Sequence, residues 1–174
     1  MNETIQTLVT RRSIRKYKKE QIADGDLRQV LEAGIYAPSG MGKQPVTIVV
    51  IQNSNTIAKL SAMNAKIMGT ASDPLYGAPT VLVVLADMKK SANAWSDGCL
   101  VMGNLMNAAA SLGLGSCWIN RAKEEFSSPE GQGLLKTWGL PVHLTGVGHC
   151  ILGYADEPAP APAPRKENFI IYDR

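Results

Sequence analysis

Hydrophobic residues recur along the chain with two different spacings, which separate predicted helices from predicted strands. Apolar side chains at three- and four-residue spacing predict a helix that begins near Asp24 and ends before Pro38. Uninterrupted β-branched runs over 46–52 and 80–86 predict strands that are covered on both faces. The pattern also predicts helices over 3–10, 54–70 and 129–138, and strands over 116–119 and 146–154.

The segment from about Asn93 to Leu112 is the most informative of the predicted helices. After Asp97 it carries no charge, and its apolar side chains wind round most of the helix circumference. A helix that is apolar on all sides must be buried on all sides. In so small a chain, we therefore expect this helix to form a subunit interface as well as part of the core. The run 113–115, Gly-Leu-Gly, ends it with a left-handed glycine cap.

Length and composition indicate a single domain over residues 1–174. Hydrophobic residues make up 45% of the chain and charged residues 19%, which excludes a disordered or coiled-coil protein. The mean hydropathy of −0.06 excludes a membrane-embedded protein. The chain shows no internal repeat and no second domain.

Charge and cysteine content limit the partners and the compartment. A net charge of +3 is too small for the whole surface to bind nucleic acid. Three cysteines without close spacing argue against a disulfide framework or a zinc site, and favour a reducing compartment. The N-terminus lacks the basic and apolar regions of a signal peptide, and the uncharged run 98–120 contains asparagines and glycines. We expect a cytoplasmic protein that binds neither nucleic acid nor membrane.

The C-terminal segment 155–174 predicts an extended arm. Alternating proline and alanine over 158–164 favour polyproline II, which would span roughly 20 Å. An apolar, strand-like end follows over 169–172. A stiff spacer that leads to an apolar end is unusual for a free terminus, so we expect the arm to lie along the body or along a partner.

The basic stretch 11–19 is the first candidate for a binding site. Its arginines carry planar donor groups suited to phosphate, and Ser13 adds a hydroxyl. Three interpretations remain open: a solvated charged turn, a site for a phosphate-bearing ligand, and a nucleic-acid contact. Tyr17 is the only aromatic residue in the stretch, which weakens the third.

No side chain of the sequence is a persuasive acid, base, nucleophile or metal ligand. The loop 38–45 has two glycines but not the spacing of a Walker loop, and on its own is typical of a structural turn. His143, His149 and Cys117 fit structural positions better than catalytic ones. We therefore expect no catalytic side chain and no metal, and an enzyme with this profile would depend on an organic cofactor.

Four segments in order, 11–17, 37–45, 107–118 and 152–167, resemble the nitroreductase family of FMN-dependent NAD(P)H oxidoreductases. The resemblance implies an α+β fold, with a central sheet flanked by helices, in an intertwined homodimer. It implies that the arm wraps the partner. It also implies two FMN molecules at the interface, each touched by both chains.

The resemblance also implies which residues bind the cofactor. Residues 11–13 and 165–166 match phosphate and ribityl contacts, and Arg15 matches a cation at the flavin pyrimidine edge. Residues 38–44 match a loop from the other subunit, and 118–120 match the segment along the flavin ring. The full set is Arg11, Arg12, Ser13, Arg15, Pro38, Ser39, Gly40, Gln44, Trp118, Ile119, Asn120, Arg165 and Lys166.

The implied activity is transfer of electrons from NADH or NADPH to nitroaromatics, quinones or similar electron-poor small molecules. The implied mechanism is ping-pong, with the chemistry at flavin N5. Residues 120–130 leave little room for helices that would cover the pocket, so we expect broad acceptor use. Three alternatives remain: a dehalogenase or flavin-fragmenting relative, a flavin-binding or redox-sensing module without turnover, and a nucleic-acid binder that uses residues 11–19.

Overall fold

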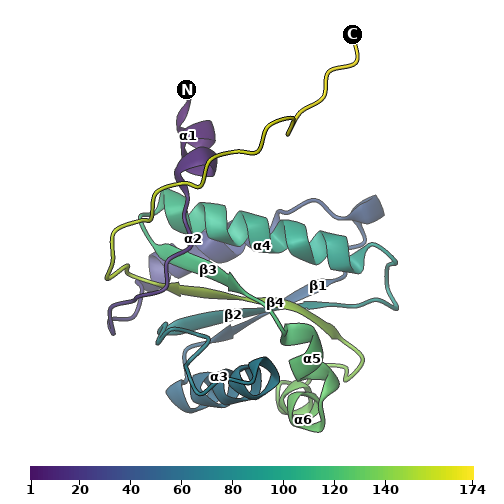
Figure 1. The fold of residues 1–174 in the computed structure, drawn as a ribbon. Coiled ribbons are helices and arrows are strands. Elements are labelled where there is room, and N and C mark those ends of the chain that lie inside the picture. The colour runs from purple at the N-terminus through teal and green to yellow at the C-terminus, as the bar shows by residue number, and fades with distance from the viewer.

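The computed structural model describes residues 1–174 and confirms the α+β class (Figure 1). Four strands form one sheet in the order β1-β2-β4-β3, and every neighbouring pair is antiparallel. The strands are β1 (Val46–Ile51), β2 (Thr80–Ala86), β3 (Gly115–Ile119) and β4 (Thr145–Gly153).

Helices cover both faces of the sheet. In Figure 1, α2 and α4 lie above the sheet, and α3, α5 and α6 lie below it. These helices are α2 (Asp24–Ile35), α3 (Ser54–Met68), α4 (Ala94–Ser111), α5 (Ala122–Ser127) and α6 (Pro129–Thr137). The first helix, α1 (Glu3–Thr10), packs outside this sandwich and buries none of its own residues. No helix is both long enough and apolar enough to cross a membrane.

The core consists of two hydrophobic clusters, one on each face of the sheet. All seven residues of β2 are buried, because this central strand sends alternate side chains into each cluster. The prediction for 80–86 is thus confirmed. The prediction that 46–52 is covered on both faces is wrong: β1 is an edge strand, and Val50 is exposed. A β-branched run indicates that both faces of a strand are apolar, but it does not indicate how many strands lie beside it.

The long helix α4 has the predicted boundaries, and the single chain buries only part of its surface. Its C-terminal end is followed by Gly113, whose φ of +73° is the expected left-handed conformation. Trp95 and Leu100 are 37% and 47% exposed. One face of α4 therefore remains uncovered in the single chain.

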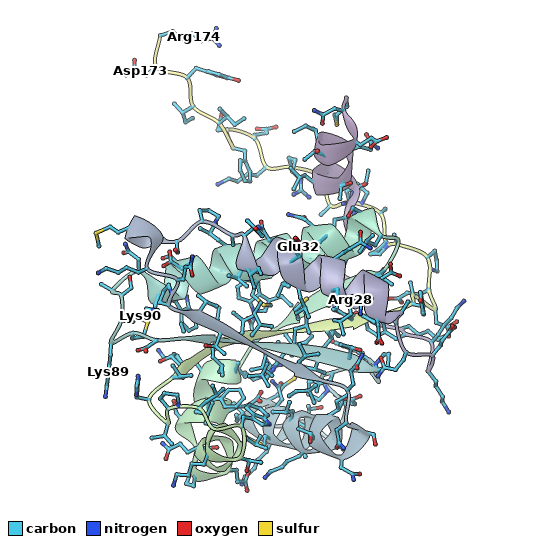
Figure 2. All side chains as sticks on the ribbon, turned by 180° about the vertical axis from the view of Figure 1, so that it is seen from behind. Arg28, Glu32, Lys89, Lys90, Asp173 and Arg174 are labelled. Carbon is cyan, nitrogen blue, oxygen red and sulfur yellow. The ribbon has the colours of Figure 1, made fainter.

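Two other segments differ from the sequence-based expectation. Residues 122–127 form α5, which is too short for hydrophobic periodicity to reveal. Residues 169–172 form no strand in the single chain, because the arm runs past α1 and away from the body (Figure 1), where no neighbouring strand is available. Figure 2 shows Asp173 and Arg174 at the far end of this arm.

Candidate functional site

The segment between α1 and α2 runs along the outer edge of β3 and fixes the basic residues there. Ser13 forms a parallel bridge with Ser116, and the Ile14 amide donates to the Ser116 carbonyl at 3.0 Å. The buried Tyr17 hydroxyl donates to the Ile14 carbonyl at 2.6 Å, and burial raises the pKa of Tyr17. Arg15, between these anchors, is exposed. The backbone of the predicted phosphate segment is therefore held at the sheet edge.

Residues from the two ends of the chain meet in one pocket beside the end of α1. This first pocket is lined by Arg11, Arg12 and Ser13 from one side and by residues 161–163 and Arg165 of the arm from the other. The structure thus brings together four of the predicted phosphate contacts. Lys166 does not line the pocket, and its ammonium lies 5.4 Å from the centre of the Phe169 ring.

Two guanidinium nitrogens of the arginines that line this pocket are buried without a hydrogen-bond partner. They are Nη1 of Arg11 and Nε of Arg12. A different nitrogen of the Arg12 guanidinium is already paired, since Nη1 donates to the carbonyls of Val9 at 3.0 Å and Arg11 at 2.7 Å. Buried donors almost always have partners, and planar guanidinium groups pair best with phosphate or carboxylate oxygens. The donor set therefore fits a phosphate group.

A second pocket lies at the end of β3. It is lined by Arg15, by residues 117–121, and by residues between Met68 and Tyr76. Three more predicted contacts, Trp118, Ile119 and Asn120, are therefore beside Arg15. Trp118 packs closely on β4, where a Cβ atom at Gly148 would lie 2.4 Å from its Nε1. Only glycine at position 148 leaves room for this ring.

A buried polar network that the sequence analysis missed contacts two residues of this second pocket, Asn120 and Arg121. Asn64 and Glu125 are fully buried, and the side-chain amide of Asn64 donates to the carboxylate of Glu125. The other carboxylate oxygen of Glu125 lies 3.0 Å from Nε2 of buried His149. Asn64 also contacts Asn120 and Arg121. No sequence motif signals this network, because its members come from α3, β4, α5 and the turn before α5.

The loop 38–44 lies elsewhere in the single chain. Pro38, Ser39 and Gln44 line a third pocket together with Asp97 of α4. The Gly40 amide donates to Asp97 Oδ1 at 3.1 Å, and the Gln44 amide, at a φ of +47°, donates to Ser39 Oγ at 3.1 Å. These contacts anchor the loop to the first turn of α4.

The predicted site residues therefore form two groups within one chain. The loop 38–44 is bonded to the N-terminal end of α4, whereas α1, which leads into the arginine segment, packs near Asn104–Ser111 at the other end (Figure 1). The 18 residues of α4 span about 27 Å. One chain alone does not bring the two groups together.

Neither the thiols nor any metal-type cluster adds a reactive group to these pockets, although Cys117 is among the residues that line the second one. Burial raises the pKa of Cys150 to about 12, so this thiol is protonated at neutral pH and is a poor nucleophile. None of the three cysteines forms a disulfide. The structure contains no group of three or more His, Cys, Asp or Glu side chains that could share a metal ion.

Comparison with known proteins gives consistent matches. The model of the nitroreductase family matches residues 8–154. An FMN reductase (NAD(P)H) of Bacillus subtilis is 28% identical over 185 aligned positions, which cover 93% of this chain and 70% of that protein. An FMN-bound nitroreductase structure from Bacteroides fragilis has a TM-score of 0.90 and 30% identity, with all of both chains covered. One from Desulfitobacterium hafniense has a TM-score of 0.88 and 27% identity, covering 99% of this chain and 100% of the other.

The resemblance that the four short segments indicate is thus confirmed at the level of the whole fold. The matched range includes the arginine segment, the loop 38–44, the long apolar helix and the end of β3. The arm beyond residue 154 lies outside the family match but is covered in the Bacteroides fragilis comparison. This chain belongs to the nitroreductase family.

Proposed function

We propose that this protein is an FMN-dependent oxidoreductase that transfers electrons from NADH or NADPH to nitroaromatic, quinone or similar electron-poor acceptors. The observation that carries the proposal is the pair of buried, unpartnered guanidinium atoms of Arg11 and Arg12 beside Ser13 and Arg165, a donor set that fits a phosphate group. The names of FMN-binding and NAD(P)H-dependent relatives support it.

In this proposal, each group of residues contacts a different part of the cofactor. Residues 11–13 and Arg165, with Lys166, hold the phosphate and ribityl end, and 118–120 lie along the isoalloxazine ring. Arg15 places a positive charge at the pyrimidine edge, where it would stabilise developing negative charge. Bound FMN would supply the redox chemistry by accepting hydride at N5 and passing electrons on. The protein therefore needs no acidic, basic or nucleophilic side chain of its own.

We also propose that the site is completed by a second copy of the chain. The second pocket encloses about 140 Å³, whereas ligand pockets usually enclose roughly 300–1,000 Å³. The loop 38–44 of a partner would supply the missing wall, since it cannot reach the arginine segment within one chain. The exposed Trp95 and Leu100 on α4 and the free edge of β1 give apolar and hydrogen-bonding surface for such a partner.

Deleting residues 168–174 is expected to weaken the dimer by at least about tenfold, because four apolar side chains at 169–172 would lose their burial against the partner. Sedimentation-velocity ultracentrifugation over a dilution series measures the effect. Deleting only Asp173 and Arg174 is the control and should leave the dimer intact. A deletion variant that sediments like the full chain would show that the arm does not hold the partner.

The proposed function is tested by purifying the protein, recording its visible spectrum and identifying the released cofactor by mass spectrometry. We expect a flavin spectrum with about one FMN per chain, bleaching by NADH or NADPH, and recovery when a nitroaromatic or quinone is added. Parallel lines in double-reciprocal plots would indicate the ping-pong mechanism. A colourless protein that does not take up added FMN would refute the proposal, and bleaching without acceptor turnover would indicate a redox-sensing module.

The three free cysteines support a reducing compartment such as the cytoplasm for this activity.

A further inference from the structure

Arg121 lies in the turn between β3 and α5, directly before the first residue of α5, and lines the same pocket as Arg15 and Asn120. Its φ of +77° and ψ of 2° lie in the left-handed region, where residues other than glycine are uncommon. Such backbone conformations persist only where the surroundings impose them, and they cluster at functional sites. The contacts that hold Arg121 in place therefore matter for what the pocket binds.

A fully buried asparagine holds the guanidinium. Asn64 Oδ1 accepts from Arg121 Nε at 2.8 Å, and Asn64 Nδ2 donates to the Asn120 carbonyl at 2.8 Å and to the Glu125 carboxylate. A carbonyl and a carboxylate can only accept, so the amide group of Asn64 must face them and its oxygen must face Arg121. Arg121 makes its only side-chain hydrogen bond through Nε, which leaves both terminal amino groups free for a ligand.

The residues that hold Arg121 are themselves fixed in the core. Glu125 Oε2 lies 3.0 Å from Nε2 of His149, and neither side chain is exposed to solvent. Asn64, Glu125 and His149 come from three different elements, so the position of Arg121 depends on the packed fold and not on a flexible surface loop. A charge that is held in advance loses little conformational freedom when it binds a ligand.

The guanidinium groups in this pocket have no acidic partner. Neither Arg15 nor Arg121 has a carboxylate oxygen within 4.0 Å. Asp73 also lines the pocket, but its oxygens accept from Ser61 Oγ at 2.5 Å and from the amides of Leu75 at 2.8 Å and Gly77 at 2.6 Å. Asp73 is therefore committed to the turn after α3. Glu157 Oε1 accepts from the Arg15 backbone amide at 2.6 Å but does not line the pocket, so the lining carries two guanidinium groups and one carboxylate.

We propose that Arg121 is a specificity-determining residue that favours electron acceptors bearing a carboxylate. The inference rests on the proposed function, because it assigns an acceptor class to the same pocket. Arg15 matches the cation beside FMN, which leaves Arg121 as the cation for the second substrate. A planar guanidinium binds a carboxylate through two parallel hydrogen bonds, and the terminal amino groups of Arg121 are available for them.

The test compares 4-nitrobenzoate with 4-nitrobenzamide, which share the ring and the reducible nitro group and differ in charge. With the FMN-loaded protein, we expect a higher kcat/KM for 4-nitrobenzoate. R121Q is expected to lower that value about tenfold, through KM, and to leave 4-nitrobenzamide within about twofold. R28Q is the matched control: it removes the same charge from the exposed surface of α2, where Figure 2 shows Arg28.

A binding measurement gives a readout that does not depend on turnover. Calorimetric titration with benzoate and benzamide should show tighter binding of benzoate, and R121Q should abolish the difference while R121K should retain part of it. If the wild-type protein binds and reduces the charged and neutral compounds equally well, the inference is wrong. An equal effect of R121Q on both compounds would also overturn it.

Two further results separate this inference from the proposed function. If neither nitro compound is reduced but benzoate still binds through Arg121, the proposed function fails and the anion site stands. If R121Q does not fold, added salt provides the test in the wild-type protein, because screening should reduce the preference for 4-nitrobenzoate. A preference that does not change with ionic strength would contradict the role of Arg121.

Discussion

Replacing Glu125 by alanine is expected to lower the free energy of unfolding by about 3–5 kcal/mol, the usual effect of removing one partner from a buried ion or hydrogen-bond pair. The carboxylate is fully buried and contacts the side chains of both Asn64 and His149. Its removal leaves Asn64 Nδ2 with one acceptor fewer and leaves His149 with neither ring nitrogen paired, since Nδ1 already lacks a partner. Urea denaturation followed by circular dichroism measures the loss.

The neighbouring Glu124 provides the control, because it lies on the same helix and is exposed. Glu124→Ala should change the free energy of unfolding by no more than about 0.5 kcal/mol. Glu125→Ala should also lower the melting temperature by roughly 10 °C, at about 2–4 °C per kcal/mol for a protein of this size. Equal stability of the two variants would mean that the buried network does not contribute to the fold.

Replacing Arg11 by alanine is expected to weaken FMN binding by about 10- to 100-fold, which corresponds to the loss of one or two charge-assisted hydrogen bonds. Arg11 is half-buried, and its Nη1 has no partner within the protein. Nη1 of Arg11 therefore stabilises the complex only when a phosphate is bound to accept its hydrogen bond. Equilibrium dialysis of the protein against free FMN gives the dissociation constant directly.

The Arg11 variant should fold normally, because the alanine removes no contact that the protein makes with itself through that atom. Arg28→Ala, on exposed α2, is the charge-matched control and should retain FMN. Arg11→Lys should give an intermediate affinity, since lysine keeps the charge but not the planar pair of donors. An Arg11→Ala protein that keeps stoichiometric FMN through dialysis would show that the phosphate site lies elsewhere.

Most of the secondary structure could be predicted because its signals are local. The spacing of apolar residues indicates α2 and α4, the glycine at 113 ends α4, and the β-branched run 80–86 forms the central strand. The errors have physical causes as well. The short α5 has no readable period, and a strand at 169–172 needs a neighbour that the single chain does not offer.

The candidate site could be predicted only where a family motif marks it. Arg11 and Trp118 belong to such motifs, and the structure places each in a pocket with the expected neighbours. Asn64, Glu125 and Arg121 have no motif, because an asparagine on an amphipathic helix and a glutamate in a short helix are ordinary residues. Their importance comes from contacts between positions 56 and 61 residues apart in the chain.

The sequence by itself determined the α+β class and the family, and it indicated the arginine and tryptophan positions that we propose for the site, because local periodicity and short ordered motifs carry that information. Only the tertiary structure decided that Arg165 meets Arg11 at one end of α4 while the loop 38–44 stays at the other. It alone also decided that a buried network holds Arg121 in the left-handed conformation. These features depend on which distant segments pack together, and packing is a property of the whole chain.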